Sequence, residues 1–181
     1  MSRRVARPYA VALFEVTQKE GVAALREIEG HLASVSELFR RAPEVLRVFE
    51  VPSVAPAAKR ELVKTIAGTL SLRPEAHRML MALAQHVRMR YVNEVVAYFR
   101  ELVDRKEGMV RGRVELPSGP SEQQVAALER GLAAVVGIRI ELEAKVREEL
   151  LAGFIVRVGS RVFDGSLLAQ VRRFAALAAG E

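Results

Sequence analysis

Hydrophobic residues recur every three or four positions through about the first 107 residues, which is the spacing of amphipathic helices. Short connections that contain proline or glycine separate these segments. The pattern therefore predicts a bundle of six helices whose neighbours pack antiparallel. The helices are predicted over Arg3–Glu20, from Leu25 to Pro43, over Glu44–Phe49, from Pro56 to Leu70, within 71–87 and over Tyr91–Glu107.

The hydrophobic period changes after Gly108 to two residues, which is the period of a half-buried strand. The segments "MVRGRVEL" and "IRIELEAKV" both alternate in this way and are predicted to be strands. Between them, Ser121 and Gln124 have the spacing of a capping box, so we expect a helix there that ends at Gly137.

The last part of the chain begins with "GFIVRVGSRVFDGS" and predicts two short strands and a helix. Gly159 and Ser160 suit a two-residue hairpin turn. Asp164 or Ser166 can then cap the final helix. The order β-α-β-β-β-α makes a small α+β domain. The predicted fold is an all-α six-helix bundle over residues 1–107 followed by an α+β domain over residues 108–181.

The first predicted helix is unusual because two of its faces are apolar. A helix on the surface of a soluble protein normally has one apolar stripe and a solvated back. A helix that is apolar all round is either surrounded by its own fold or covered by a partner. One face carries Val5, Tyr9, Ala12 and Val16, and the other carries Ala6, Ala10, Leu13 and Phe14.

The fifth predicted helix has the same excess of apolar surface. Two interpretations remain open from the pattern alone. The extra faces complete the core, or they adjoin and form a groove for an amphipathic partner helix. Ala76, Leu80, Leu83, Ala84 and Val87 can face the bundle, which leaves Met79, Ala82 and Met81 on another side beside Arg78.

Composition restricts the class of protein. Half of the residues are hydrophobic and 28% are charged, which is typical of a globular chain. The formal net charge is +6, but arginines and lysines occur singly or in pairs with glutamate nearby, so we expect no nucleic acid as a partner. The chain has no cysteine, and we find neither a secretory signal nor a membrane-spanning run. We expect a cytoplasmic monomer.

Residues for catalysis are not arranged in any recognised pattern. His31, His77 and His86 have no carboxylates at metal-ligand spacing, and the chain lacks the glycine-rich phosphate-binding motifs. The stretch "VGSRVFDG" lacks the G-x-S-x-G spacing of a nucleophile elbow. We therefore expect a protein without an enzymatic activity, a cofactor or a metal.

Three stretches resemble one family. "ARPYAVALFEVTQKEG", "LAQHVRMRYVNEVVAYF" and "LLAGFIVRVGSRVFDGSLLAQVRRF" are similar to segments of the delta subunit of bacterial rotary ATP synthases. The mitochondrial counterpart of this subunit is the oligomycin-sensitivity-conferring protein. Two positions depart from the family: Ala152 precedes Gly153 where many members have Gly-Gly, and Arg147 stands where an acidic or amide residue is common. The C-terminal signature comprises Ala152, Gly153, Gly159, Asp164 and Ser166.

The resemblance implies a stator subunit without catalytic residues, held at the cytoplasmic face of the cell membrane only through its complex. In the family, the helical domain lies on the catalytic α3β3 head and holds the N-terminal helix of an α subunit between helices one and five. The C-terminal domain engages the C-terminal region of the b subunits of the peripheral stalk. Carried onto this chain, the groove comprises Val5, Tyr9, Ala12, Val16, Arg78, Met79 and Ala82.

Two other classes stay open from the residues. A generic helical adaptor would use the same groove for a different amphipathic helix. A basic nucleic-acid-binding protein would instead depend on the net charge, and its affinity would fall steeply with salt.

Overall fold

A computed structural model describes residues 2–158, 161–167 and 169–170. Its contacts divide the chain into two compact units, Met1–Glu107 and Gly108–Glu181, and each is described by itself. The first unit is helical and the second contains a four-stranded sheet. The prediction of a helical N-terminal region followed by an α+β domain is confirmed.

Proline and glycine set the boundaries of the N-terminal helices. Pro43, Pro56 and Pro74 each occupy the first turn of a helix, where a residue without an N–H loses no hydrogen bond. Gly21, with φ of +97°, separates the first two helices. The helices are α1 (Ser2–Thr17), η1 (Gln18–Glu20), α2 (Val22–Arg41), α3 (Pro43–Glu50), α4 (Pro56–Thr69), α5 (Pro74–Gln85), η2 (Met89–Tyr91) and α6 (Val92–Lys106).

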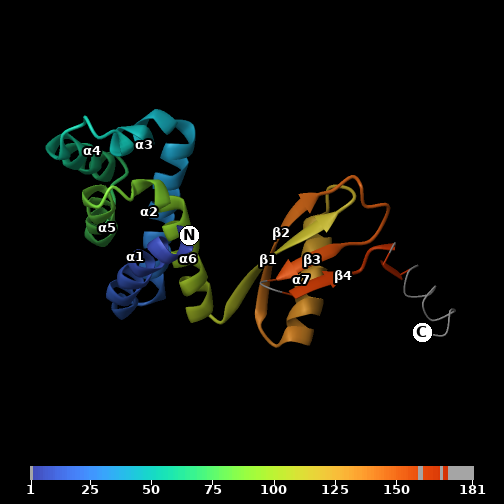
Figure 1. The fold of residues 1–181 in the computed structure, drawn as a ribbon. Helices are drawn as coiled ribbons and strands as arrows, with labels where there is room; N and C mark the ends of the chain where they lie inside the picture. The colour runs from blue at the N-terminus through green and yellow to red at the C-terminus, as the bar shows by residue number, and fades with distance from the viewer. Residues whose placement is uncertain (1, 159–160, 168, 171–181) are drawn as a thin grey trace. The chain divides into compact units, whose positions relative to one another are not determined.

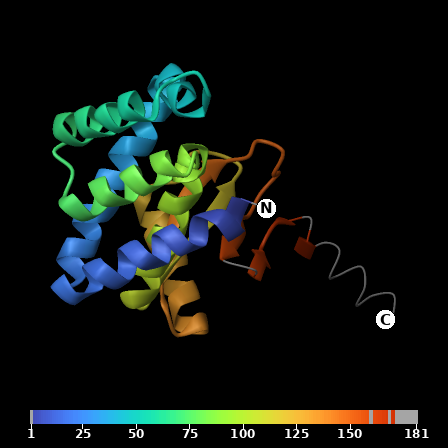
Figure 2. The same cartoon turned by 60° about the vertical axis from the view of Figure 1, so that its left-hand side comes forward.

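The core of this unit forms where α6 packs against both α1 and α2 (Figures 1 and 2). Phe99 of α6 is fully buried and its ring meets that of Phe14 edge-on, with 6.3 Å between the centroids. Ala6, Ala10 and Leu13, which lie on one of the two apolar faces of α1, are buried in the same cluster. One apolar face of α1 is therefore a core face.

Two predictions for α5 are wrong. The sequence predicts that Val87 faces the bundle, but this residue is 54% exposed. The helix ends at Gln85, and Val87 lies in the turn beyond it with φ of +54°. Met79 was expected on the side away from the bundle, but it is buried in the core cluster.

The second unit is a sheet with strand order β2-β1-β3-β4 and the helix α7 packed on it (Figure 1). Strand β1 pairs parallel with β2 and antiparallel with β3, which in turn pairs antiparallel with β4. Val114 and Val156 are fully buried at its centre. The elements are β1 (Met109–Leu116), α7 (Glu122–Val136), β2 (Arg139–Val146), β3 (Ile155–Val158) and β4 (Arg161–Asp164).

Local sequence signals account for the ends of α7 and for the close packing of the sheet in this unit. Ser121 and Gln124 form the predicted capping box, and Gly137 ends α7 in the left-handed conformation. Gly112 in β1 permits close packing, because a Cβ there would lie 2.7 Å from Cγ2 of Val158. The predicted turn at Gly159-Ser160 and most of the last predicted helix lie outside the described residues.

Candidate functional site

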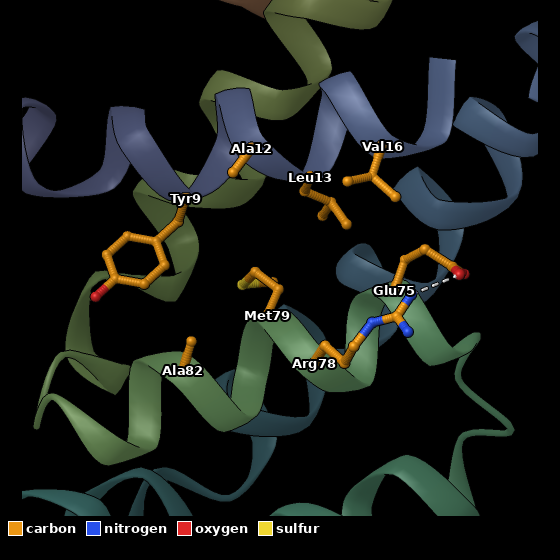
Figure 3. Close-up of a pocket in the computed structure, with 8 residues that line it drawn as sticks. All are labelled: Tyr9, Ala12, Leu13, Val16, Glu75, Arg78, Met79 and Ala82. Carbon is orange, nitrogen blue, oxygen red and sulfur yellow. Dashed lines mark hydrogen bonds and ion pairs between the residues drawn. The ribbon is translucent and has the colours of Figure 1, made fainter. Parts of the chain in front are cut away.

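A groove runs between α1 and α5 in the helical unit (Figure 3). Its volume is about 300 Å³ and its surface is mostly apolar. Because α1 and α5 run in opposite directions, Tyr9 faces Ala82 at one end and Val16 lies near Glu75 at the other (Figure 3). The lining residues are Tyr9, Ala12, Leu13, Val16, Glu75, Arg78, Met79 and Ala82.

The floor of the groove is continuous with the core, whereas its walls reach solvent. Leu13 is 5% exposed and Met79 is 7% exposed, and both belong to the core cluster. Val16 is 52% exposed, and the side chains of Ala12 and Ala82 at the walls are small. These small side chains leave the two helix backbones accessible to close approach. The groove can therefore take an apolar ridge, as a partner helix would present.

The structure brings together six of the seven groove residues chosen from the sequence. Val5 is half-buried and does not line the groove. Leu13 and Glu75 line it but were missed by sequence reasoning. The signal for Leu13 was its position one turn after Tyr9, and that for Glu75 was its position one turn before Arg78.

Charges at the Val16 end of the groove are paired with one another. Glu75 bonds with Arg78 at 3.0 Å and with Arg73 at 3.3 Å. Arg73 also pairs with Glu27 at 2.9 Å and with Glu20. A backbone N–H bond, together with these guanidinium groups, holds the pKa of Glu75 below its usual range against the opposing effect of burial. This end is therefore ionised and nearly balanced in charge.

The Tyr9 end carries a different arrangement. A guanidinium nitrogen of Arg88 donates to the hydroxyl of Tyr9 at 3.1 Å, and the guanidinium carbon lies 5.9 Å from the centre of the Tyr9 ring. Arg88 follows the C-terminus of α5, where its backbone N–H donates to Leu83 O at 2.8 Å. Val87 N–H donates to Ala84 O in the same turn, so the turn is a Schellman motif. Sequence reasoning did not select Arg88.

Four of the five residues of the C-terminal signature, Ala152, Gly153, Asp164 and Ser166, lie where the segment before β3 meets the segment after β4. Gly153 has φ of +90°, and a Cβ there would lie 2.3 Å from the carbonyl oxygen of Gly165. The N–H of Leu167 donates to Ala152 O at 3.0 Å and that of Gly165 donates to Phe154 O at 2.9 Å. Glycine is required at Gly153 because both the space and the backbone conformation exclude a side chain.

The side chains of Asp164 and Ser166 accept hydrogen bonds from backbone N–H groups in the segment after β4. Asp164 Oδ1 accepts from the N–H of Ser166 at 3.0 Å. Ser166 Oγ accepts from the N–H of Ala169 at 3.2 Å, as a helix cap does. Gly159, the remaining signature residue, lies outside the described residues. Within the described part, the signature is explained by backbone geometry.

The described residues contain no group of three histidines or acids that could hold a metal. Among them, His31 Nδ1 accepts from the N–H of Arg73 at 3.3 Å, which gives it a structural role. None of the helices in the described ranges is both long and apolar enough to cross a bilayer. The described part of the chain is a helical unit with an apolar groove on its surface, joined to a small α+β domain.

Comparison with known proteins identifies the family of this chain. Residues 5–177 match the family described as ATP synthase delta (OSCP) subunit. ATP synthase subunit delta of Nitratidesulfovibrio vulgaris is 32% identical over 171 residues, covering 92% of this chain and 91% of the relative. The same subunit of Carboxydothermus hydrogenoformans is 28% identical and covers 95% of each chain.

A solved structure has the same fold. A chain of the mitochondrial ATP synthase hexamer of Toxoplasma gondii aligns with a TM-score of 0.70 and 21% identity, covering 99% of this chain and 97% of that one. The chain belongs to the ATP synthase delta (OSCP) subunit family. By family it is a non-catalytic subunit of the peripheral stalk, or stator, of an ATP synthase complex.

Proposed function

We propose that the groove between α1 and α5 holds the N-terminal helix of an α subunit, and that the C-terminal domain binds the C-terminal region of the b subunits. The chain then links the top of the α3β3 head to the peripheral stalk. Proton flow turns the rotor of such a machine, and the stator prevents the head from turning with it. In this proposal the subunit is peripheral to the cytoplasmic face of the membrane and reaches it through the complex.

The observation that carries this proposal is the exposed apolar groove in a chain of this family. Ala12 and Val16 of α1 are exposed in the groove, and Tyr9 is half-buried beside them at the edge of the core. A bound amphipathic helix would cover them and bury apolar surface worth about 25 cal/mol per Å², before the cost of association is subtracted. Tyr9 offers a large, rigid contact of the kind that dominates many interfaces.

Calorimetric titration of the full chain tests this function. The titrant is a synthetic peptide that spans the N-terminal segment of the α subunit from the same organism. We expect one peptide to bind per chain, with a negative heat-capacity change from the burial of apolar surface. Absence of binding by the folded chain would contradict the role of the groove.

A further inference from the structure

Strand β2 forms one edge of the four-stranded sheet, with β1 as its neighbour in the described sheet. An edge strand presents a row of backbone N–H and C=O groups to which another strand can add. β2 has eight residues, against four in β4 at the opposite edge, and its residues 143–146 are all exposed. The edge is therefore long enough to accept a second strand.

Alternate residues of β2 direct their backbone groups toward β1 and away from it. The N–H of Arg147, immediately after the strand, donates to Leu116 O of β1 at 2.7 Å. The odd-numbered residues of β2 therefore bond with β1, and the even-numbered residues face the open edge. Leu142, Ala144 and Val146 accordingly present their N–H groups to that edge.

A side chain of α7 covers one of these groups. Glu129, in the middle of the helix, accepts the N–H of Leu142 through Oε1 at 2.8 Å. The helix packs on β2, and its Leu128 and Leu132 lie against the core of the sheet. The carboxylate of Glu129 is thereby held at the open edge. A strand that added there would have to displace this carboxylate and break its hydrogen bond.

The charges of β2 suit a second copy of the same strand. Two β2 strands that lie antiparallel and are centred on Glu143 would place Glu141 of each copy opposite Lys145 of the other. In that register Leu142 of one copy bonds with Ala144 of the other, so the N–H that α7 covers is required. Glu143 would meet its own counterpart, and this like-charge contact should keep the association weak.

We propose that Glu129 closes the β2 edge to strand addition, and that without it the edge pairs with β2 of a second copy of this chain. The interaction surface is the open edge of β2, and its partner is an antiparallel copy of the same strand. This role of Glu129 is confined to the second unit and is independent of the groove and of the α-subunit helix proposed for it.

Analytical ultracentrifugation of the full chain over a range of concentrations tests this role. We expect wild type to remain monomeric, whereas the average mass of Glu129→Ala should rise with concentration by up to about twofold, as a symmetric dimer requires. Glu129→Gln keeps an oxygen that can accept the N–H of Leu142, so it should remain monomeric. Arg130→Ala, at the next and exposed position of α7, is the matched control and should behave as wild type does.

Ala144→Pro in the Glu129→Ala background identifies the surface that associates. Proline removes an N–H that faces the open edge and leaves the bonds to β1 in place, so the double variant should return to a monomer. A Glu129→Ala chain that stays monomeric at every concentration would overturn the closing role of Glu129. Association that persists in the double variant would overturn the assignment of the contact to the β2 edge.

Discussion

Individual side chains decide what the groove accepts. Ala12 and Ala82 are small enough for a partner backbone to approach, and Tyr9 supplies a wide aromatic surface. Leu13 and Met79 close the groove underneath and at the same time belong to the core. Substitutions of the wall residues should therefore change binding, whereas substitutions of the floor residues should also change stability.

Ala12→Asp places a carboxylate on the apolar wall of the groove. Because a bound helix would desolvate that charge without a partner, we expect the affinity for the α-subunit peptide to fall more than about tenfold. The free chain should nearly keep its melting temperature, since Ala12 lines the open groove and does not belong to the buried core. Ala57→Asp, at an exposed alanine of α4, serves as the matched control and should bind as wild type does.

Tyr9→Ala removes the largest aromatic surface of the groove together with the partner of Arg88. We expect a loss of about 2 kcal/mol in the binding free energy, as for other aromatic anchors. Calorimetry on Tyr9→Phe separates the two effects, because the phenylalanine keeps the ring and lacks the hydroxyl. Unchanged affinity of Tyr9→Ala would remove this residue from the binding surface.

Val87→Gly should stabilise the helical unit by about 0.5–1 kcal/mol, although it removes a hydrophobic side chain. Val87 is largely exposed, and its φ of +54° strains a β-branched residue. Val51 is similarly exposed but has φ of −70°, so Val51→Gly should be destabilising. Thermal unfolding of Val87→Gly and Val51→Gly checks that the two changes in stability have opposite signs. A melting temperature of Val87→Gly below that of wild type would contradict the strain at Val87.

The secondary-structure elements follow closely from local sequence signals, and the contacts between them do not. Pro43, Pro56 and Pro74 each begin a helix, and Ser121 caps another, so these boundaries could be predicted. The two apolar faces of α1 also identified one wall of the groove. Arg88 was missed because it meets Tyr9 across 79 positions of sequence, a contact that no local period contains. The turn after α5 was missed because no glycine marks its left-handed residue.

An ion-pair network at the partly exposed surface of the helical unit joins α2 to α6. Glu29, which is 7% exposed, pairs with Arg26 at 2.5 Å and with Arg100 at 2.6 Å. Arg26 also bonds Asp104 at 3.2 Å and pairs with Glu107 at the end of this unit. The network connects the first turns of α2 to the C-terminal half of α6 and to Glu107 just beyond it.

This network should make the helical unit sensitive to acid. Burial raises the pKa of Glu29, but the bonds from Arg26 and Arg100 outweigh it and hold the pKa below its ordinary value. A carboxylate with a lowered pKa stabilises the fold above its unfolded pKa and loses that contribution as the pH falls through its folded pKa. We therefore expect the melting temperature to fall below about pH 4.3, the ordinary pKa of glutamate. Glu29→Gln should be less stable than wild type at neutral pH, and the difference should shrink in acid.

Position 153 should tolerate no side chain, because the backbone of another segment lies close to it. Gly153→Ala places a methyl group against the backbone of Gly165 and Ser166 in a left-handed conformation, so we expect a loss of about 3 kcal/mol in the C-terminal domain. Gly131, inside α7 with open space around it, is the matched control. Gly131→Ala should stabilise the domain by about 0.5–1 kcal/mol. Denaturant unfolding, monitored by a signal from the sheet domain, distinguishes the destabilising Gly153→Ala from the stabilising Gly131→Ala.

The whole molecule combines two units with different roles in the proposed function. The helical unit has an apolar groove on the surface of a well-packed core, and the second unit joins a small sheet to the C-terminal signature. In the proposed function, the net charge of +6 would favour the approach of any acidic partner segment and would mainly affect the rate of association. A stator needs both units occupied at once, so loss of either interface should uncouple the head from the stalk.

The absence of cysteine makes the assembled complex directly testable, because any introduced cysteine is the only one in the chain. The decisive measurement is disulfide cross-linking in purified ATP synthase between Ala12→Cys or Ala82→Cys and single cysteines along the N-terminal helix of the α subunit. We expect cross-links from both groove positions to successive turns of the α helix, and none from the control Ala57→Cys. An intact complex in which neither groove position cross-links to α would contradict the assignment of this groove.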